Sequence, residues 1–462
     1  MPRSFASRSQ VSRRLLLTSA GAASLTAALA ACGGNGGSSG SSASAKAVSQ
    51  ADIDKAMTTP TELTFWTWVP NIAKEVALFE KKYPAVKVKV VNAGQGTPQY
   101  TKLRTALKAG TGAPDVVQIE YQYIPTFTIT DSLLDLRPYG ASSLKSQFVD
   151  WTWSQVSGSN GEVFAIPQDT GPMGMLYRQD IFDKHGIAVP NTWDEFATAA
   201  RKLHKADPDV YLTNLAANQA AAWHGLMWQA GAQPYVTSGR SDIAINVDGA
   251  VSKKMAAYWG GLAKEGVIGV EPDFSDSWYA ALNKGKYATW ITAAWGPVFL
   301  AGSAKSTAGK WRAAPLPQWD AATPSAGNWG GSTSAVIKAT KNPIAAAMFA
   351  QFLNSDPASA KLFATEQFFF PATKALLTEA DFVSDAPTFY GGQKVNQVFA
   401  DISSTVNSSF QWPPFLDQAA TDWTETVGKS LADKTNTVRA LGSWQSRLTT
   451  YAKTQGFTVH SA

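Results

Sequence analysis

The chain has 462 residues, of which 45% are hydrophobic and 16% are charged, so it is too apolar to be disordered and long enough to bury a large core. One cysteine and four histidines exclude a disulfide framework and any zinc site built on two thiolates, and we expect neither a metal ion nor a cofactor. Four arginines before residue 15 account for most of the net charge of +5. Without these four, 36 of the 40 basic residues remain against 35 acidic ones. A nucleic-acid partner is therefore not expected.

Residues 1–31 have the pattern of a signal peptide. Four arginines precede a stretch from Leu15 to Ala31 that contains only Leu, Ala, Ser, Thr and Gly, too short and mild for a stable membrane span. The pair Arg13-Arg14 resembles a twin-arginine export signal. The segment Leu29-Ala30-Ala31-Cys32-Gly33 looks like a bacterial lipobox, which implies a lipidated Cys32.

For residues 32–59 the sequence predicts a lipid anchor followed by a flexible tether. Gly33 to Lys46 is rich in Gly, Ser and Ala, and 14 such residues reach roughly 20 Å. Several acyl chains on one cysteine give stable anchoring. The expected location is outside the cell, on the outer face of the cytoplasmic membrane.

From residue 60 the pattern alternates between strands and helices. Strands are predicted over 61–68, 86–91 and 114–119, and the helices between them cover 70–83 and the segment that ends at Gly110. Repetition of this unit predicts an α/β fold with mostly parallel sheets flanked by helices.

The later part of the chain continues in this style with more helix. Thr192 to Glu195 form a capping box before a helix over 196–205, and Asn342-Pro343 and Asp356-Pro357 each predict a capped helix start. Apolar residues at 344, 348 and 352 predict the buried stripe of the first of these two helices.

No recognised catalytic motif occurs, but the 17 tryptophans divide into two groups. Trp193, Trp259, Trp423 and Trp444 lie in helical patterns and are predicted to be core residues. The other group lies where strands should end, next to Gly or Pro, at the edge where α/β sheets bind ligands. Its members are Trp66, Trp68, Trp290, Trp295, Trp329 and Trp412.

Sugars suit such aromatic rings, because the C–H face of a pyranose packs on a ring while its hydroxyl groups need polar partners. Polar candidates stand at equivalent strand ends. These are Gln95, Gln118, Glu120 and the pair Gln168-Asp169.

An ordered set of segments resembles one family. The set includes LTFWTW (63–68), GTGAPDVV (110–117), LLDL (133–136), AIPQDTGPMGMLY (165–177), GIAVPNTWDEF (186–196), ATWITAAWG (288–296), NWGGS (328–332) and NPIAAAMFAQFLN (342–354). The chain is similar over residues 60–372 to extracellular solute-binding lipoproteins of ABC importers of the carbohydrate type. Beyond 373 the likeness is thin, apart from Trp412-Pro413-Pro414.

This resemblance implies a periplasmic-binding-protein fold, in which two lobes close over a ligand by a hinge. One lobe would hold 60–170 and 316–370, and the other 171–315 and 371–462, with a helix-rich C-terminal part. The implied protein is a monomer without enzymatic activity that delivers a mono- or oligosaccharide to a permease. The implied ligand-binding residues are Trp66, Trp68, Glu120, Asp169, Trp295, Trp329 and Gly330, with Trp223 in a segment where the family often supplies another ring.

Two alternatives remain open at this stage. A secreted glycoside hydrolase would use Glu120 and Asp169 as its carboxylate pair, which requires a separation of about 5 to 9.5 Å. The same fold could also bind a polyol, a glycerol phosphodiester or a peptide. The carboxylates and amides at the strand ends favour a neutral polyhydroxylated ligand.

Overall fold

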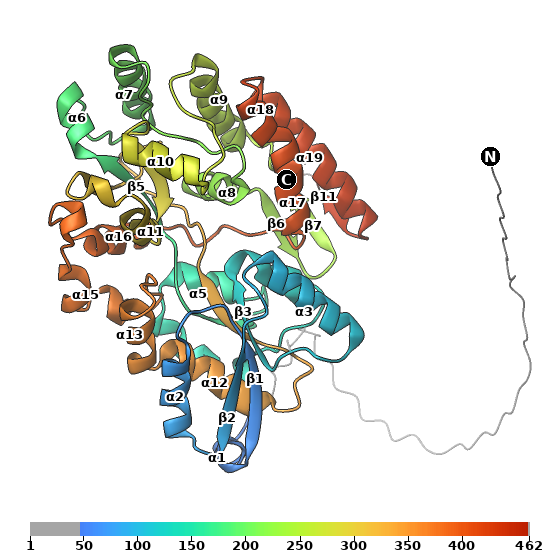
Figure 1. Ribbon diagram of the computed structural model, residues 1–462. Helices are drawn as coiled ribbons and strands as arrows, with labels where there is room; N and C mark the ends of the chain where they lie inside the picture. The colour runs from blue at the N-terminus through green and yellow to red at the C-terminus, as the bar shows by residue number, and fades with distance from the viewer. Residues whose placement is uncertain (1–46, 461–462) are drawn as a thin grey trace, which may run out of the picture. The chain divides into compact units, whose positions relative to one another are not determined.

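The computed structural model describes residues 47–460 (Figure 1). The predicted signal peptide, Cys32 and the Gly/Ser-rich stretch up to Lys46 lie outside the described residues. Within residues 47–460, no helix combines the length and the apolar character that a membrane span requires.

The prediction of a flexible tether up to residue 59 is wrong at its end. Residues Gln50–Thr58 form helix α1, whose first turn is capped by Ser49, since the Ser49 side chain accepts a hydrogen bond from the Asp52 N–H. Met57 of this helix is buried. The cap and this apolar anchor fix the segment in the fold.

The first sheet has five strands in the order β2-β1-β3-β10-β4. Strands β1, β2 and β3 are mutually parallel, whereas β10 is antiparallel to both β3 and β4. The late strand β10 thus lies between two early ones. The bounds are β1 Thr61–Trp66, β2 Val86–Val91, β3 Val116–Glu120, β4 Ala165–Pro167 and β10 Ser332–Val336.

Helices α2 and α12 pack beside this sheet (Figure 1). The ring centroid of Phe349 in α12 lies 5.3 Å from that of Phe65 and 5.0 Å from that of Phe79. These three residues belong to the first buried apolar cluster. The helices of this region are α2 Ala73–Lys82, α3 Thr97–Ala109, α4 Ile124–Thr128, α5 Asp150–Val156, α12 Pro343–Ser355 and α13 Pro357–Thr365, with short 3₁₀ turns at Tyr121–Tyr123, Arg137–Tyr139 and Ala141–Gln147.

The second sheet corrects the prediction of mostly parallel sheets. Its order is β8-β5-β9, and β5 is antiparallel to both neighbours. Strand β5 is the central strand of this sheet. Strands β8 and β9, which a helical segment separates in the chain, lie on either side of β5 and run in the opposite direction. The bounds are β5 Met173–Arg178, β8 Thr289–Ala293 and β9 Trp311–Pro315.

A third sheet joins the hairpin β6-β7 to the last strand, β11, which pairs parallel with β7. Its strands are β6 Tyr235–Ser238, β7 Asp242–Ile245 and β11 Thr458–His460. The helices of this part of the chain are α6 Gln179–His185, α7 Trp193–Ala206, α8 Ala220–Gln229, α9 Ala250–Glu265, α10 Asp276–Lys284 and α11 Gly296–Ser303, with a 3₁₀ turn at Lys305–Thr307.

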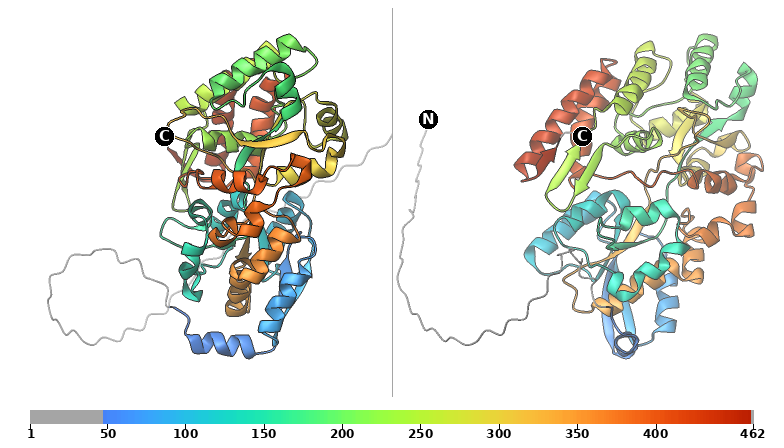
Figure 2. Two further views of the ribbon diagram at one scale, coloured as in Figure 1. Left: turned by 90° about the vertical axis from the view of Figure 1, so that its left-hand side faces the viewer. Right: turned by 180° about the vertical axis from the view of Figure 1, so that it is seen from behind.

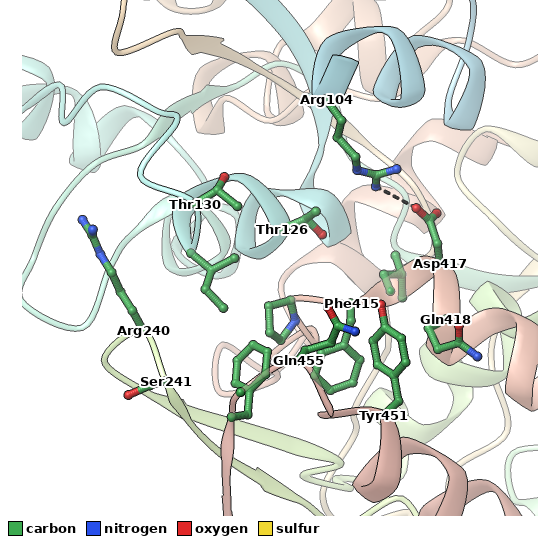
Figure 3. Close-up of a pocket in the computed structure, with 15 residues that line it drawn as sticks. Arg104, Thr126, Thr130, Arg240, Ser241, Phe415, Asp417, Gln418, Tyr451 and Gln455 are labelled. Atoms are coloured by element: carbon green, nitrogen blue, oxygen red, sulfur yellow. Dashed lines mark hydrogen bonds and ion pairs between the residues drawn. The ribbon is translucent and has the colours of Figure 1, made fainter. Parts of the chain in front are cut away.

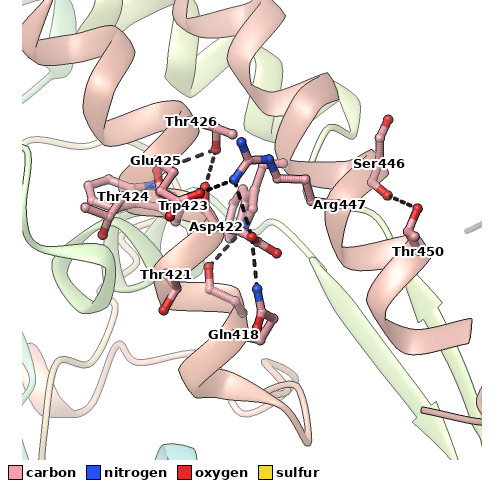
Figure 4. A network of polar contacts seen from close by, with 12 residues as sticks. Gln418, Thr421, Asp422, Trp423, Thr424, Glu425, Thr426, Ser446, Arg447 and Thr450 are labelled. Atoms are coloured by element: carbon pink, nitrogen blue, oxygen red, sulfur yellow. Dashed lines mark hydrogen bonds and ion pairs between the residues drawn. The ribbon is translucent and has the colours of Figure 1, made fainter. Parts of the chain in front are cut away.

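The C-terminal part is rich in helix, as predicted. Its elements are α14 Lys374–Leu377, α15 Ala380–Ser384, a 3₁₀ turn at Thr388–Tyr390, α16 Val395–Ser403, α17 Leu416–Trp423, the π-helical segment Thr424–Gly428, α18 Lys429–Ala432 and α19 Thr437–Thr454. Helix α19 lies beside β7 and β11 (Figure 2). Arg447 of α19 reaches both Asp422 and Glu425, which ties α19 to α17 and the π-helical segment (Figure 4).

The helix signals of the sequence have mixed outcomes. The capping box at Thr192 and the cap at Asp356 are confirmed, and Gly110 ends α3 in a left-handed conformation. Asn342, however, makes no capping hydrogen bond with its side chain.

The stripe predicted for α12 is also wrong. Ile344, Met348 and Phe352 are only half-buried. The buried positions are Ala345, Ala346, Ala347, Phe349, Ala350, Leu353 and Asn354. The helix contacts strands β1, β4 and β10 together with α1, α2 and α13, so its alanine face approaches the sheet closely.

Three segments connect the first sheet with the second sheet and its helices, and they run side by side. They are residues 168–172 after β4, 316–331 before β10 and 366–373 after α13. Isolated bridges join Asp169 to Pro371 and Pro172 to Asn328, and the Thr170 N–H donates to the Phe370 carbonyl over 2.8 Å. The three crossings therefore form one bundle of extended chain.

Candidate ligand-binding site

Two predicted carboxylates flank the first residue of β10. Glu120 ends β3 and pairs with Ser332 in the sheet register, and the Ser332 N–H donates to Asp169 Oδ1 over 3.0 Å. The Tyr100 hydroxyl donates to Glu120 Oε2 over 3.1 Å and accepts the Glu120 N–H over 3.0 Å. The sheet thus brings Glu120 and Asp169 together, although they come from different strands.

Burial changes the acidity of both groups. It raises the pKa of Asp169 to about 7, although hydrogen bonds from the Ser332 N–H and the Gln168 amide oppose this effect, and the nearby charge of Glu120 adds to it. Burial also raises the pKa of Glu120, although the hydrogen bond from the Tyr100 hydroxyl opposes this effect. Both groups therefore hold a proton more readily than a carboxylate in water does.

Gln118 lies beneath this corner rather than on its surface, with 1% of its area exposed. Its side-chain oxygen accepts hydrogen bonds from the Thr67 hydroxyl (2.7 Å) and the Trp68 N–H (3.1 Å), and its amide nitrogen donates to Ser332 Oγ (3.1 Å). The amide is used within the protein, where it holds the loop after β1 against β3 and β10.

The remaining predicted residues of the first sheet lie at the carboxyl ends of its strands. Trp66 and Trp68 are half-buried, and Trp68 meets Tyr100 edge to face with ring centroids 6.2 Å apart. Gln95 is exposed in the loop between β2 and α3.

Trp295 and Trp329 form a perpendicular pair, with ring centroids 4.8 Å apart and planes at 83°. The Trp295 indole N–H donates to the Trp329 carbonyl over 2.7 Å. Gly330 has φ +89°, and a Cβ there would lie 3.2 Å from the indole nitrogen of Trp295, so glycine leaves room for this contact. The Trp329 N–H donates to the Gly171 carbonyl over 2.8 Å, which places the pair two residues from Asp169.

Two other predicted rings lie in the interior. Trp223 is 1% exposed and packs against Trp423 at 5.9 Å, and Trp412 is 4% exposed and packs against His224 at 5.3 Å. Each indole N–H lacks a hydrogen-bond partner in the described part of the chain. The four tryptophans that the helical patterns assign to the core are buried as predicted.

Sequence reasoning missed two phenylalanines beside the tryptophan pair, because it considered only the tryptophans at strand ends. Phe274 lies 6.0 Å from Trp295 and 6.1 Å from Trp329, and Phe299 lies 5.7 Å from Trp295 between ring centroids. Both are exposed, Phe274 by 39% and Phe299 by 54%. Exposed aromatic rings beside Trp295 make both residues further candidates for the site.

A pocket of about 540 Å³ lies between α3, α4, the β6-β7 turn and α17 (Figure 3). Beside it, Arg104 of α3 forms an ion pair with Asp417 of α17 at 2.7 Å, and the Tyr123 hydroxyl donates to the other oxygen of Asp417 over 2.7 Å. The Tyr123 ring lies 4.1 Å from that of Tyr100, which in turn binds Glu120. Sequence reasoning missed Arg104, Tyr123 and Asp417 as well.

Comparison with known proteins matches residues 66–360 to the model of the bacterial extracellular solute-binding protein family. A lactose-binding protein of Rhizobium radiobacter is 27% identical over 374 residues, which cover 74% of this chain and 81% of that protein. An arabinooligosaccharide-binding protein of Halalkalibacterium halodurans is 25% identical over 75% of this chain and 80% of its own.

Solved structures agree. The ABC transporter associated binding protein of B. animalis subsp. lactis Bl-04, solved with β-1,6-galactobiose, is 32% identical and superposes with a TM-score of 0.74, covering 87% of this chain and all of that chain. The fold is the periplasmic-binding-protein fold with mixed sheets and a helix-rich C-terminal part. The glycoside hydrolase alternative is thereby excluded, and the function is capture of a solute without catalysis. The chain belongs to the family of bacterial extracellular solute-binding proteins.

Proposed function

We propose that the protein captures a mono- or oligosaccharide and delivers it to the permease of an ABC importer. The observation that carries this proposal is the placement of the Trp295–Trp329 pair beside Asp169 and Glu120. Aromatic faces and carboxylate acceptors are the two kinds of group that a sugar ring requires. The sugars that the lactose-binding and galactobiose-binding relatives hold support the same class of ligand.

The mechanism of capture is closure of two lobes on the ligand. The proposed lobes are 60–170 with 316–370 and 171–315 with 371–462, and the bundle of three crossing segments is the proposed hinge. A sugar that touches Glu120 on one side and Trp295 on the other stabilises the closed state by the contacts that only this state offers. The permease then recognises the closed state of what we propose is a monomeric receptor.

A titration monitored by tryptophan fluorescence tests the ligand class, with lactose, β-1,6-galactobiose and arabinooligosaccharides as first probes. Trp295→Ala and Trp329→Ala should each weaken binding by about 1 to 3 kcal/mol, on the scale of stacked rings. Trp153→Phe is the control, because Trp153 of α5 packs on Phe148 in the first buried apolar cluster, outside the crossing segments. Unchanged affinity in both site variants would refute the site.

We also propose that Cys32 is lipidated and anchors the protein to the outer face of the cytoplasmic membrane. The resemblance of residues 29–33 to a lipobox supports this. Cys32→Ser should move the protein from the membrane fraction to the medium and abolish incorporation of labelled palmitate. Retention of Cys32→Ser in the membrane fraction would contradict the anchor.

A further inference from the structure

Glu75, in the first turn of α2, is a buried carboxyl group without a hydrogen-bond partner in the described part of the chain. None of its surface is exposed. Gln367 lies beside it in the segment after α13, is 8% exposed, and has a side-chain oxygen that also lacks a partner within residues 47–460. Buried polar groups are costly unless they are paired, so the two side chains require an explanation.

The amide of Gln367 is oriented by a second contact. Its nitrogen donates to the Pro70 carbonyl over 3.1 Å, which leaves its oxygen for Glu75. If the amide turned round, the Pro70 carbonyl would lose this donor. A protonated Glu75 fits such a neighbour, because its O–H donates to Gln367 Oε1 and pairs two buried groups at once, whereas an ionised carboxylate would meet another acceptor.

The hydrogen bond from Gln367 to Pro70 joins two strained turns. Asn71, which follows Pro70, has φ +58°, and Phe368, which follows Gln367, has φ +57°. The left-handed region is costly for both residues, and most of all for phenylalanine. Such a backbone persists only where the surrounding contacts fix it, so the buried groups at this place have a structural task.

The two turns belong to parts of the molecule that bear on ligand binding. Residues 67–72 form the loop between β1 and α2, which carries the candidate binding residue Trp68. Residues 366–373 are one of the three segments that cross between the first sheet and the second. A contact between these two segments therefore couples the position of the loop to the crossing segments.

We propose that Glu75 is a positioning residue for ligand binding: in its protonated form it donates to Gln367 Oε1 and so holds the loop 67–72 against the crossing segment 366–373. The effect on sugar affinity rests on the proposed function, whereas the hydrogen bond and its effect on the loop do not.

The electrostatics of Glu75 support a protonated form. Burial raises its pKa, although hydrogen bonds with its own backbone and with the Gln367 side chain oppose this effect. Two charged groups act on it, Glu366 at the end of α13, which raises the pKa further, and Lys74 of α2, which lowers it. Lys74 and Glu366 also form an ion pair with each other at 2.7 Å.

Thermal unfolding at different pH values tests the protonated form. Because the pKa of Glu75 is raised from 4.5, its contribution to stability is complete below this value and is lost as the pH rises through the folded pKa. Glu75→Gln places a neutral amide donor there at every pH. The unfolding midpoint of this variant should match that of the wild type at pH 4 and exceed it at pH 8.

A double-mutant cycle tests the partner. Gln367→Met removes the acceptor and keeps the length of the side chain, so the gain in midpoint from Glu75→Gln at pH 8 should be smaller in that background. Equal gains in the two backgrounds would make Glu75 a buried acid that acts without Gln367, and would overturn the inference.

Hydrogen exchange tests the effect on the loop. At pH 8, the backbone amides of 67–72 and 366–373 should exchange more slowly in Glu75→Gln than in the wild type. Glu366→Gln is the matched control, because it removes the neighbouring exposed carboxylate and leaves Glu75 in place, and it should slow the exchange of neither segment. Unchanged exchange of both segments in Glu75→Gln would contradict the proposal.

Titration with lactose at pH 8 tests the effect on binding. Glu75→Gln should bind about two- to tenfold more tightly than the wild type, the scale of one hydrogen bond. Equal affinity despite slower exchange would overturn the positioning role. A wild-type protein that binds neither lactose nor any other sugar would refute the proposed function alone, because the midpoints and the exchange rates are measured without ligand.

Discussion

If Asp169 contacts the sugar as proposed, ligand binding should depend on pH. Because burial raises its pKa to about 7, the free protein holds a growing fraction of ionised Asp169 as the pH rises from 5.5 to 8. Hydroxyl donors of a sugar favour the ionised form, so affinity should rise over this range and level off above it. The gain is about tenfold for each pKa unit by which the ligand lowers the pKa. Titrations in this pH range measure it, and Asp169→Asn should give a flat profile.

The stability of the unliganded protein should show the opposite slope. Between the unfolded pKa near 3.8 and the folded value near 7, the folded state binds the Asp169 proton more tightly than the unfolded state does. The contribution of Asp169 to stability therefore falls as the pH rises through this window. Asp169→Asn should remove that part of the slope in thermal unfolding, and a slope unchanged by the variant would contradict the assignment.

At the residue scale, the sequence identifies residue types at strand ends but not which way their side chains face. The position of Glu120 and Asp169 at the ends of β3 and β4 could be predicted, because each follows a run of apolar residues with the pattern of a buried strand. Gln118 and Trp412 could not be placed, since burial depends on what packs above them, and that comes from β10 in one case and from α8 in the other.

The turn before β10 depends on glycine at 331. Gly331 has φ +88°, and a Cβ there would lie 2.7 Å from the Asp169 carbonyl oxygen and 2.8 Å from Tyr121 Cε2. Gly331→Ala should destabilise the fold by about 1 to 2 kcal/mol of backbone strain and about 1 to 3 kcal/mol of overpacking. Denaturant unfolding measures the sum.

Gly456→Ala separates the two effects, because Gly456 has φ +89° with no atom within 4 Å of an added Cβ. This variant should show the strain alone. Equal losses in the two variants would mean that the close approach of Gly331 to Asp169 has no energetic weight.

At the element scale, local signals predict where elements begin and end better than how they pair. The capping box of α7 and the glycine that ends α3 depend on neighbouring residues and were predictable. The antiparallel direction of β5 was not predictable, because it depends on how residues 168–172 lead the chain from the first sheet into the second. The buried face of α12 was displaced by one residue for a similar reason, since at least eight elements contact that helix.

Across the whole molecule, Asp417 joins the C-terminal helices to α3 through Arg104 and to the 3₁₀ turn before α4 through Tyr123. If the lobes close as proposed, this contact stabilises the closed state although it touches no ligand. Asp417→Asn should weaken sugar affinity by about two- to fivefold, the scale of an exposed ion pair. Small-angle scattering of the unliganded variant should show a larger radius of gyration.

Arg201→Gln is the control, since it breaks another partly exposed pair, with Glu265, between α7 and α9. It should change neither the affinity nor the radius. An Asp417→Asn protein with wild-type affinity and radius of gyration would refute this role of the Asp417 contacts. Such a contact joins positions 313 residues apart, so no sequence pattern reveals it.

The place of β10 in the first sheet also bears on how the chain folds during synthesis. Residues 332–336 pair with both β3 and β4, so the edges of those two strands stay open until about three quarters of the chain has been made. Open edges of this kind invite pairing with other chains. A fragment that ends before residue 332 should therefore aggregate rather than fold into the first sheet and its helices.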